Sequence, residues 1–130
     1  MSPWLAAGAV LAFGVGLAHS VLGERYILMR LMRRDLPKLF GADTFTKRTL
    51  RFAWHLTTVA WWGFAAQMAW AAAVLSHEEG AARAALLQPI AWTFVVSALV
   101  TAAASRGRHL AWPVFAAIAA CAWLAVWRTT

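Results

Sequence analysis

Residues 52–76 read FAWHLTTVAWWGFAAQMAWAAAVLS, an uninterrupted run without an Asp, Glu, Lys or Arg. A helix needs about 20 mostly apolar residues in a row to cross the hydrocarbon core of a bilayer. Within lipid, every backbone polar group must find its partner inside the same segment, so we expect this run to be a transmembrane helix. It also contains His55, an ionisable residue of a kind that is costly inside a membrane.

Three further uncharged runs cover residues 2–23, 84–105 and 110–127. Of the 130 residues, 62% are hydrophobic and only 13% are charged, whereas a globular domain carries roughly 25% charged residues. A soluble domain of this size buries too little surface to hide so much apolar material. The sequence therefore predicts an all-α, integral membrane four-helix bundle that forms a single transmembrane domain over residues 1–130.

The basic residues predict the orientation of this bundle. Eight of the 12 lie in the connection between the first two runs: Arg25, Arg30, Arg33, Arg34, Lys38, Lys47, Arg48 and Arg51. Arg106 and Arg108 lie between the third and fourth runs, which leaves Arg83 and Arg128 for the opposite side. Because cytoplasmic loops carry the excess of Lys and Arg, we expect both termini outside the cell. The predicted location is a bacterial-type inner (plasma) membrane, as a multi-pass protein.

The connection 24–51 is expected to be a basic cytoplasmic hairpin with its own structure. Residues 24–34 are mostly good helix formers and predict an extension of the first helix beyond the membrane. Pro and Gly within residues 35–41 predict a turn. Asp43 or Thr44 is then a suitable N-cap for the second helix. The basic rim of the hairpin predicts contact with anionic lipid headgroups.

The formal net charge of +7 and the single cysteine exclude several other classes. A basic chain can indicate a nucleic-acid partner, but Lys and Arg beside apolar runs set membrane topology, so no nucleic acid is predicted. Cys121 alone cannot form an intramolecular disulfide, and no Cys/His finger spacing is present. The first run lacks a basic segment before it and is expected to be a retained span instead of a signal peptide.

Two stripes with a spacing of four residues predict how the helices pack. The first run carries small residues at Gly8, Ala12, Gly16 and Ser20, and the third run carries hydroxyl residues at Thr93, Ser97, Thr101 and Ser105. Small residues let the backbones of membrane helices approach closely, and hydroxyl groups can hydrogen-bond a neighbouring helix. We expect both stripes to lie at helix–helix interfaces.

Three histidines are expected at one depth near the cytoplasmic face. His19 lies five residues before Glu24 near the end of the first run, His55 lies four residues after Arg51 near the start of the second, and His109 directly precedes the fourth. At 1.5 Å per residue, His19 and His55 lie about 6–8 Å below the charged boundary. Ionisable residues in membrane spans usually face the bundle interior and mark function. Glu24 can reach the same layer from just outside it.

Pro113 leaves two positions open for His109. Within a helix, a proline at this position removes the hydrogen bond to the carbonyl of His109. If the fourth helix instead begins near Trp112, Pro113 occupies its first turn without cost, and His109 belongs to the preceding loop.

A histidine layer of this kind suits two cofactors. Imidazoles together with a carboxylate suit zinc or iron, and the candidate metal ligands are His19, His55, His109 and Glu24. Heme b is the other cofactor, with two of the histidines as axial ligands. Gly16 would then leave room for a porphyrin face, and Arg51 or Arg108 would meet the propionates. The predicted function is electron transfer or metal handling.

An alternative function is an accessory or structural membrane subunit without a cofactor. In that case the small-residue faces pack against partner spans, in a homo-oligomer or a larger membrane complex, and the histidines only cap and pack. No serine nucleophile motif, phosphate-binding loop or paired catalytic carboxylates are present in the sequence. The sequence therefore leaves open whether the protein is an enzyme.

Overall fold

The computed structural model describes residues 2–74 and 80–127, and these residues are almost entirely helical. Their only extended pairing is an isolated bridge between Leu39 and Ala42. The elements, in chain order, are α1 (Pro3–Gly23), a π-helical turn η1 (Glu24–Leu28), α2 (Met29–Leu31), α3 (Thr44–Val74), α4 (Gly80–Ser105) and α5 (Ala111–Trp127). The predicted all-α class is confirmed.

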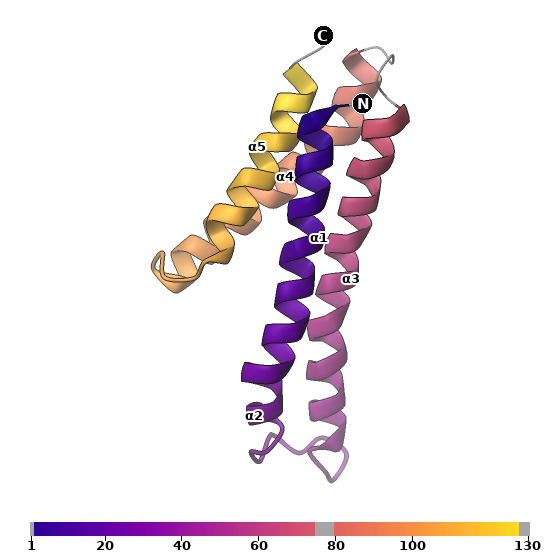
Figure 1. Cartoon of the computed structure of the whole chain (residues 1–130). Helices are drawn as coiled ribbons and strands as arrows, with labels where there is room; N and C mark the ends of the chain where they lie inside the picture. The colour runs from indigo at the N-terminus through magenta and orange to yellow at the C-terminus, as the bar shows by residue number, and fades with distance from the viewer. Residues whose placement is uncertain (1, 75–79, 128–130) are drawn as a thin grey trace.

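The helices form two antiparallel hairpins (Figure 1). The first hairpin pairs α1 and its extension with α3, and the second pairs α4 with α5. The hairpins meet through α1 and α5 at the end where α1 begins and α5 ends. Towards the other end, the linker between α4 and α5 leans away from the α1–α3 pair (Figure 1).

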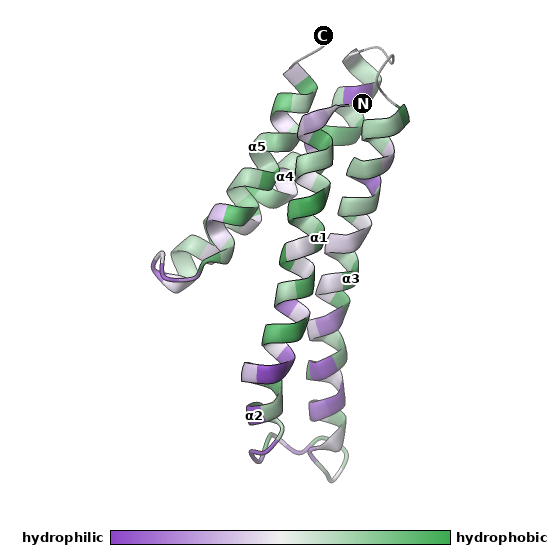
Figure 2. Cartoon of the chain, viewed as in Figure 1, coloured by the Kyte–Doolittle hydropathy of each residue, from purple (hydrophilic) through white to green (hydrophobic). Residues whose placement is uncertain are grey.

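Two of the described helical segments are long and apolar enough to cross a membrane. They are Pro3–Leu31, formed by α1, η1 and α2, and α4 (Gly80–Ser105). Helix α5 is also apolar but has only 17 residues. In Figure 2 the hydrophilic residues gather at the end of the α1–α3 pair that is distant from the N-terminus and in the α4–α5 linker. These hydrophilic ends contain residues 24–51 and 106–108, the two connections that carry most of the basic residues.

The main core lies where the two hairpins meet, and all four long helices contribute to it. Its fully buried large side chains are Leu5, Met68, Leu87, Phe94 and Ile118. Aromatic contacts extend this core, because the ring of Phe94 lies 5.7 Å from that of Phe64 on α3. The same ring lies 5.9 Å from that of Phe115 on α5.

The small-residue stripe on α1 lies at helix interfaces, as predicted. A methyl group added at Gly8 would lie 3.1 Å from Met68 Sδ on α3 and 3.2 Å from Cys121 Cβ on α5. Ala12 is fully buried. Such close approach is what small residues permit between membrane helices. The stripe therefore explains why α1 is the helix that contacts both α3 and α5.

Three members of the hydroxyl stripe on α4 donate to their own helix. Thr93, Ser97 and Ser105 donate to carbonyls four residues earlier in their own helix, at 2.8, 2.7 and 2.6 Å. Ser and Thr side chains in helices readily make this local bond. Their hydroxyl groups are therefore satisfied without a neighbouring helix.

The basic hairpin between α1 and α3 has the predicted organisation. The first helix extends to Leu31, three residues short of the expected end. The turn contains Gly41 with φ of 87°, a conformation that glycine adopts without strain. Asp43 immediately precedes α3, and its carboxylate lies 2.6 Å from Lys47 Nζ. This hydrogen bond to Lys47 holds the pKa of the Asp43 carboxyl below its usual value.

Of the two alternatives for Pro113, the structure shows the one in which this residue lies in the first turn of the fourth long helix. Helix α5 begins at Ala111, so Pro113 lies in its first turn, where no intrahelical N–H bond is lost. His109 consequently belongs to the α4–α5 linker and not to a membrane-spanning helix.

Candidate functional site

The candidate site lies along the seam between α1 and α3, towards the basic hairpin. Because the two helices are antiparallel, residues whose numbers sum to about 75 face one another, as Ser20 faces His55 and Glu24 faces Arg51. Glu24 stands at the junction of α1 and the π-helical turn η1. Single π-helical turns inside α-helices often occur at functional sites. The seam therefore brings a hydroxyl, a carboxylate, an imidazole and a guanidinium into one layer.

These four side chains form a continuous polar network. Ser20 Oγ lies 2.6 Å from His55 Nδ1, and His55 Nε2 lies 3.2 Å from Glu24 Oε2. Arg51 donates from Nε to Glu24 Oε2 at 3.2 Å and from its terminal nitrogen to Oε1. The carboxylate thus accepts a two-point bond from the guanidinium, the geometry that gives the strongest pairs of this kind.

His19 occupies an aromatic environment beside this network. Its ring stacks on Trp54, with the ring centroids 4.5 Å apart and an interplanar angle of 5°. Trp61 meets the same ring edge-on at 4.8 Å. The indole Nε1 of Trp54 also donates to the backbone carbonyl of His19 at 3.1 Å. Within the described part of the chain, His19 Nε2 is buried and has no hydrogen-bond partner.

His109 and Arg108 lie in the α4–α5 linker, on the second hairpin, and both are exposed. The ring nitrogen His109 Nδ1 accepts from Ala111 N at 3.1 Å, and Ser105 Oγ accepts from His109 N at 3.3 Å. His109 therefore caps the start of α5.

The structure thus assembles part of the predicted site. Glu24, Arg51 and His55 are in direct contact, and His19 joins them through neighbouring residues of the same seam. In residues 2–74 and 80–127, no three His, Cys, Asp or Glu side chains are grouped so that they could hold a metal ion. The space expected beside Gly16 is filled, because a methyl group there would lie 2.8 Å from Trp62 Nε1.

Two residues of the site were not predicted. Ser20 was assigned to the small-residue stripe, although it is also the hydrogen-bond partner of His55. Trp54 immediately precedes His55 in the sequence and provides the stacking partner of His19. The adjacent pairs His19–Ser20 and Trp54–His55 are the signal that could have indicated both contacts, once the two helices are aligned antiparallel.

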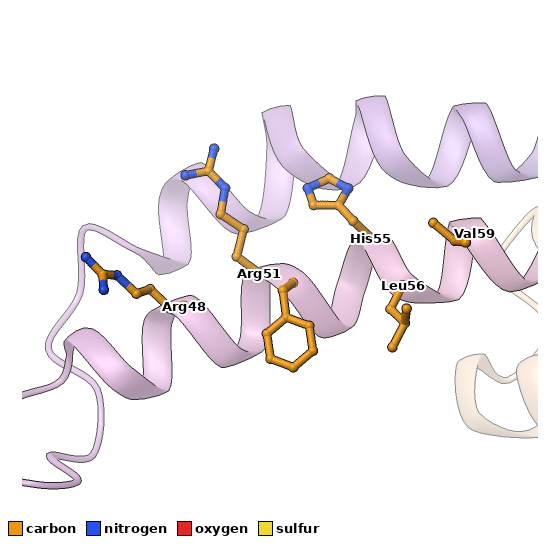
Figure 3. Close-up of a pocket in the computed structure, with 6 residues that line it drawn as sticks. Arg48, Arg51, His55, Leu56 and Val59 are labelled. Atoms are coloured by element: carbon orange, nitrogen blue, oxygen red, sulfur yellow. The ribbon is translucent and has the colours of Figure 1, made fainter.

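A shallow groove runs along α3 beside this network (Figure 3). Its lining side chains are Arg48, Arg51, Phe52, His55, Leu56 and Val59. Figure 3 shows the side chain of His55 directed towards the neighbouring helix α1. His55 therefore belongs both to the polar network and to the groove.

No protein-family model, curated protein or solved structure matches this chain.

Replacing Glu24 with Gln is expected to lower the free energy of unfolding by about 1–2 kcal/mol, because it removes the charged partner of Arg51 and His55. The effect stays moderate because the Arg51 side chain is 57% exposed and remains hydrated. Denaturant unfolding of Glu24→Gln, Arg51→Gln and the double variant measures the coupling between the two side chains. Additive effects of the two substitutions would contradict an energetic link between them.

Proposed function

We propose that the chain is a four-span inner-membrane protein with the basic hairpin in the cytoplasm and both termini outside. Only 28% of the apolar window in each of the two long apolar segments is buried, whereas the core helix of a soluble protein is mostly buried. Large apolar side chains are exposed on other helices too, such as Leu56 and Val59 on α3. Exposed apolar surface on this scale is unfavourable in water but normal against lipid. Helix α3 would cross as the partner of α1, and α5 as the partner of α4.

Cysteine labelling tests this placement. In a Cys121→Ala background, Gly41→Cys is expected to react with a membrane-impermeant maleimide in inverted vesicles but not in intact spheroplasts. A cysteine introduced at Ser2 should show the opposite pattern. The proposed topology has one crossing between the N-terminus and the hairpin, so the two positions must lie on opposite sides. Labelling of both positions from the same side would contradict it.

We infer further that the site around His19 binds a cofactor at the inner leaflet, for electron transfer or metal handling. The observation that carries this inference is the buried His19 Nε2, which lacks a partner among the described residues. A buried polar atom without a hydrogen bond costs free energy. Coordination to a metal would satisfy this nitrogen, while Trp54 and Trp61 hold the ring in place.

Because no three such side chains are grouped in the described residues, the other candidate ligands would have to move towards His19 as well as give up present hydrogen bonds. His55 Nε2 and Glu24 Oε2 are 3.2 Å apart, a separation that suits two ligands at about 2.0–2.2 Å from one ion. His109 would have to release the backbone N–H of Ala111 if it ligates through Nδ1. Because Trp62 fills the space beside Gly16, we favour a zinc or iron ion over heme b.

Titration of the purified, chelator-treated protein tests this proposal. Zn²⁺, Fe²⁺ and hemin are added in separate experiments, and binding is followed by calorimetry and, for hemin, by absorption. The expected result is saturable binding of about one equivalent of metal ion. If only hemin binds saturably, the cofactor would be heme b and not a metal ion. If none of the three binds, the proposal of a cofactor site would be refuted.

The second candidate function is that of an accessory membrane subunit. It is favoured by the divergence of the hairpins in Figure 1, because the α4–α5 linker leans away from the α1–α3 pair. Exposed apolar residues such as Val21 and Leu22 lie on that part of α1. Native mass spectrometry from mild detergent is expected to find a homo-oligomer or a larger complex under this alternative, and a monomer without a partner would contradict it.

A further inference from the structure

The groove on α3 changes in chemical character from one end to the other. Its lining residues form two neighbouring rows with spacings of three or four positions, 48–51–55–59 and 48–52–56–59, so together they cover one side of the helix. Arg48 and Arg51 line the end near the basic hairpin, and Leu56 and Val59 line the other end. From Arg48 to Val59 the helix rises by about 16 Å. The groove is therefore basic at one end and apolar at the other.

The basic end of the groove can accept an anion. Arg48 is exposed, and its side chain makes no hydrogen bond or ion pair among the described residues. Arg51 donates to Glu24 from one edge of its guanidinium but remains 57% exposed. Glu24 pairs with Arg51, and Arg48 has no carboxylate partner among the described residues, so a positive charge remains for a ligand.

The apolar end of the groove suits an acyl chain. Phe52, Leu56 and Val59 are 60%, 57% and 58% exposed, although all three are large apolar side chains. The hydrocarbon part of one leaflet is about 15 Å thick, half of the roughly 30 Å core. From Phe52 to Val59 the apolar end rises by about 10 Å, so it covers roughly two thirds of the depth that one lipid chain spans.

We propose that this groove holds one anionic phospholipid of the inner leaflet, with its phosphate against Arg48 and Arg51. One acyl chain of that lipid lies along Phe52, Leu56 and Val59. His55 stands where headgroup and chain meet, and it connects the bound lipid with the Glu24 network. This proposal rests on the proposed membrane placement but not on the proposed cofactor.

Native mass spectrometry of the detergent-purified protein tests the lipid site, with phosphatidylglycerol and phosphatidylcholine of equal chain length as probes. We expect one phosphatidylglycerol to bind at least fivefold more tightly than phosphatidylcholine. Arg48→Gln should weaken phosphatidylglycerol binding about fivefold and leave phosphatidylcholine unchanged. Arg34→Gln makes the same change of charge in the same hairpin, outside the groove, and should leave both affinities unchanged. Circular dichroism confirms that each variant is folded.

Three results would overturn the proposal. If Arg34→Gln weakens phosphatidylglycerol binding as much as Arg48→Gln does, the effect would come from the overall charge of the hairpin. Equal affinity for phosphatidylglycerol and phosphatidylcholine would exclude recognition of the headgroup. Displacement of the lipid by millimolar inorganic phosphate would mean a site for free phosphate. Failure of the membrane placement would be visible separately, in the labelling pattern of Gly41→Cys.

Discussion

Replacing His19 with Ala is expected to abolish metal binding, with a loss of affinity of about 100-fold or more. His19 is the histidine whose buried Nε2 has no partner in the described part of the chain, so in the proposed site it would ligate without giving up a hydrogen bond. Even the loss of residues that only support a metal ligand typically costs 10–100-fold in affinity. Calorimetric titration of the chelator-treated variant measures the change.

Two further variants separate ligation from packing. His19→Ala also removes the stacking on Trp54 and Trp61, which is worth about 0.5–1.5 kcal/mol for an aromatic pair. His19→Phe keeps an aromatic ring there but has no nitrogen, so it should remain folded and still lose the metal. His77, which lies outside the described residues, provides the matched control, and His77→Ala should bind as the unchanged protein does. Wild-type affinity in His19→Phe would show that His19 is not a ligand.

Gly23→Ala is expected to lower the free energy of unfolding by about 2–3 kcal/mol. Gly23 is buried, and a methyl group added to it would collide with the indole ring of Trp54. That indole donates to the carbonyl of His19 and stacks on its ring, so it cannot move without breaking both contacts. Overpacking of this kind costs about 1–3 kcal/mol and a lost hydrogen bond adds about 1 kcal/mol, while the better helix propensity of alanine offsets up to about 1 kcal/mol.

The chain contains a matched control for this substitution. Gly14 lies on the same helix, and a methyl group added there meets no atom within 4 Å. Gly14→Ala is therefore expected to be neutral or stabilising by up to about 1 kcal/mol, because alanine is the better helix former. Unfolding both variants by titration with a denaturing detergent compares them directly. Similar stabilities of Gly14→Ala and Gly23→Ala would contradict the close packing of Trp54 against α1.

Much of the helical architecture could be predicted from the sequence because its signals are local. Long uncharged runs locate the helices, the Pro and Gly residues locate the turn, and the stripe from Gly8 to Ser20 identifies the closely packed face of α1. The start of α5 was left open, because Pro113 fits either a helix interior or a first turn. The structure places it in the first turn.

The candidate site was less predictable because it depends on helix rotation. Glu24, Arg51 and His55 meet as their shared depth suggested. The hydroxyl groups of Thr93 and Ser97 on α4 donate to carbonyls of their own helix, which are always close enough for a hydrogen bond. A partner on another helix is available only for some rotations of α4 about its axis. The similar predicted depth of the three histidines gave no information on the angle between the two hairpins. In the structure the hairpins diverge, and His109 lies in the α4–α5 linker, where it caps α5.

The proposed cofactor site around His19 can be tested on one sample of the protein purified in mild detergent. Its absorption spectrum is recorded as isolated and after dithionite, and its metal content is determined in parallel. We expect a sample without a Soret band that contains about one equivalent of zinc or iron. A Soret band that sharpens on reduction would identify heme b instead of a metal ion. A sample with neither metal nor a Soret band would contradict the claim and favour the accessory subunit.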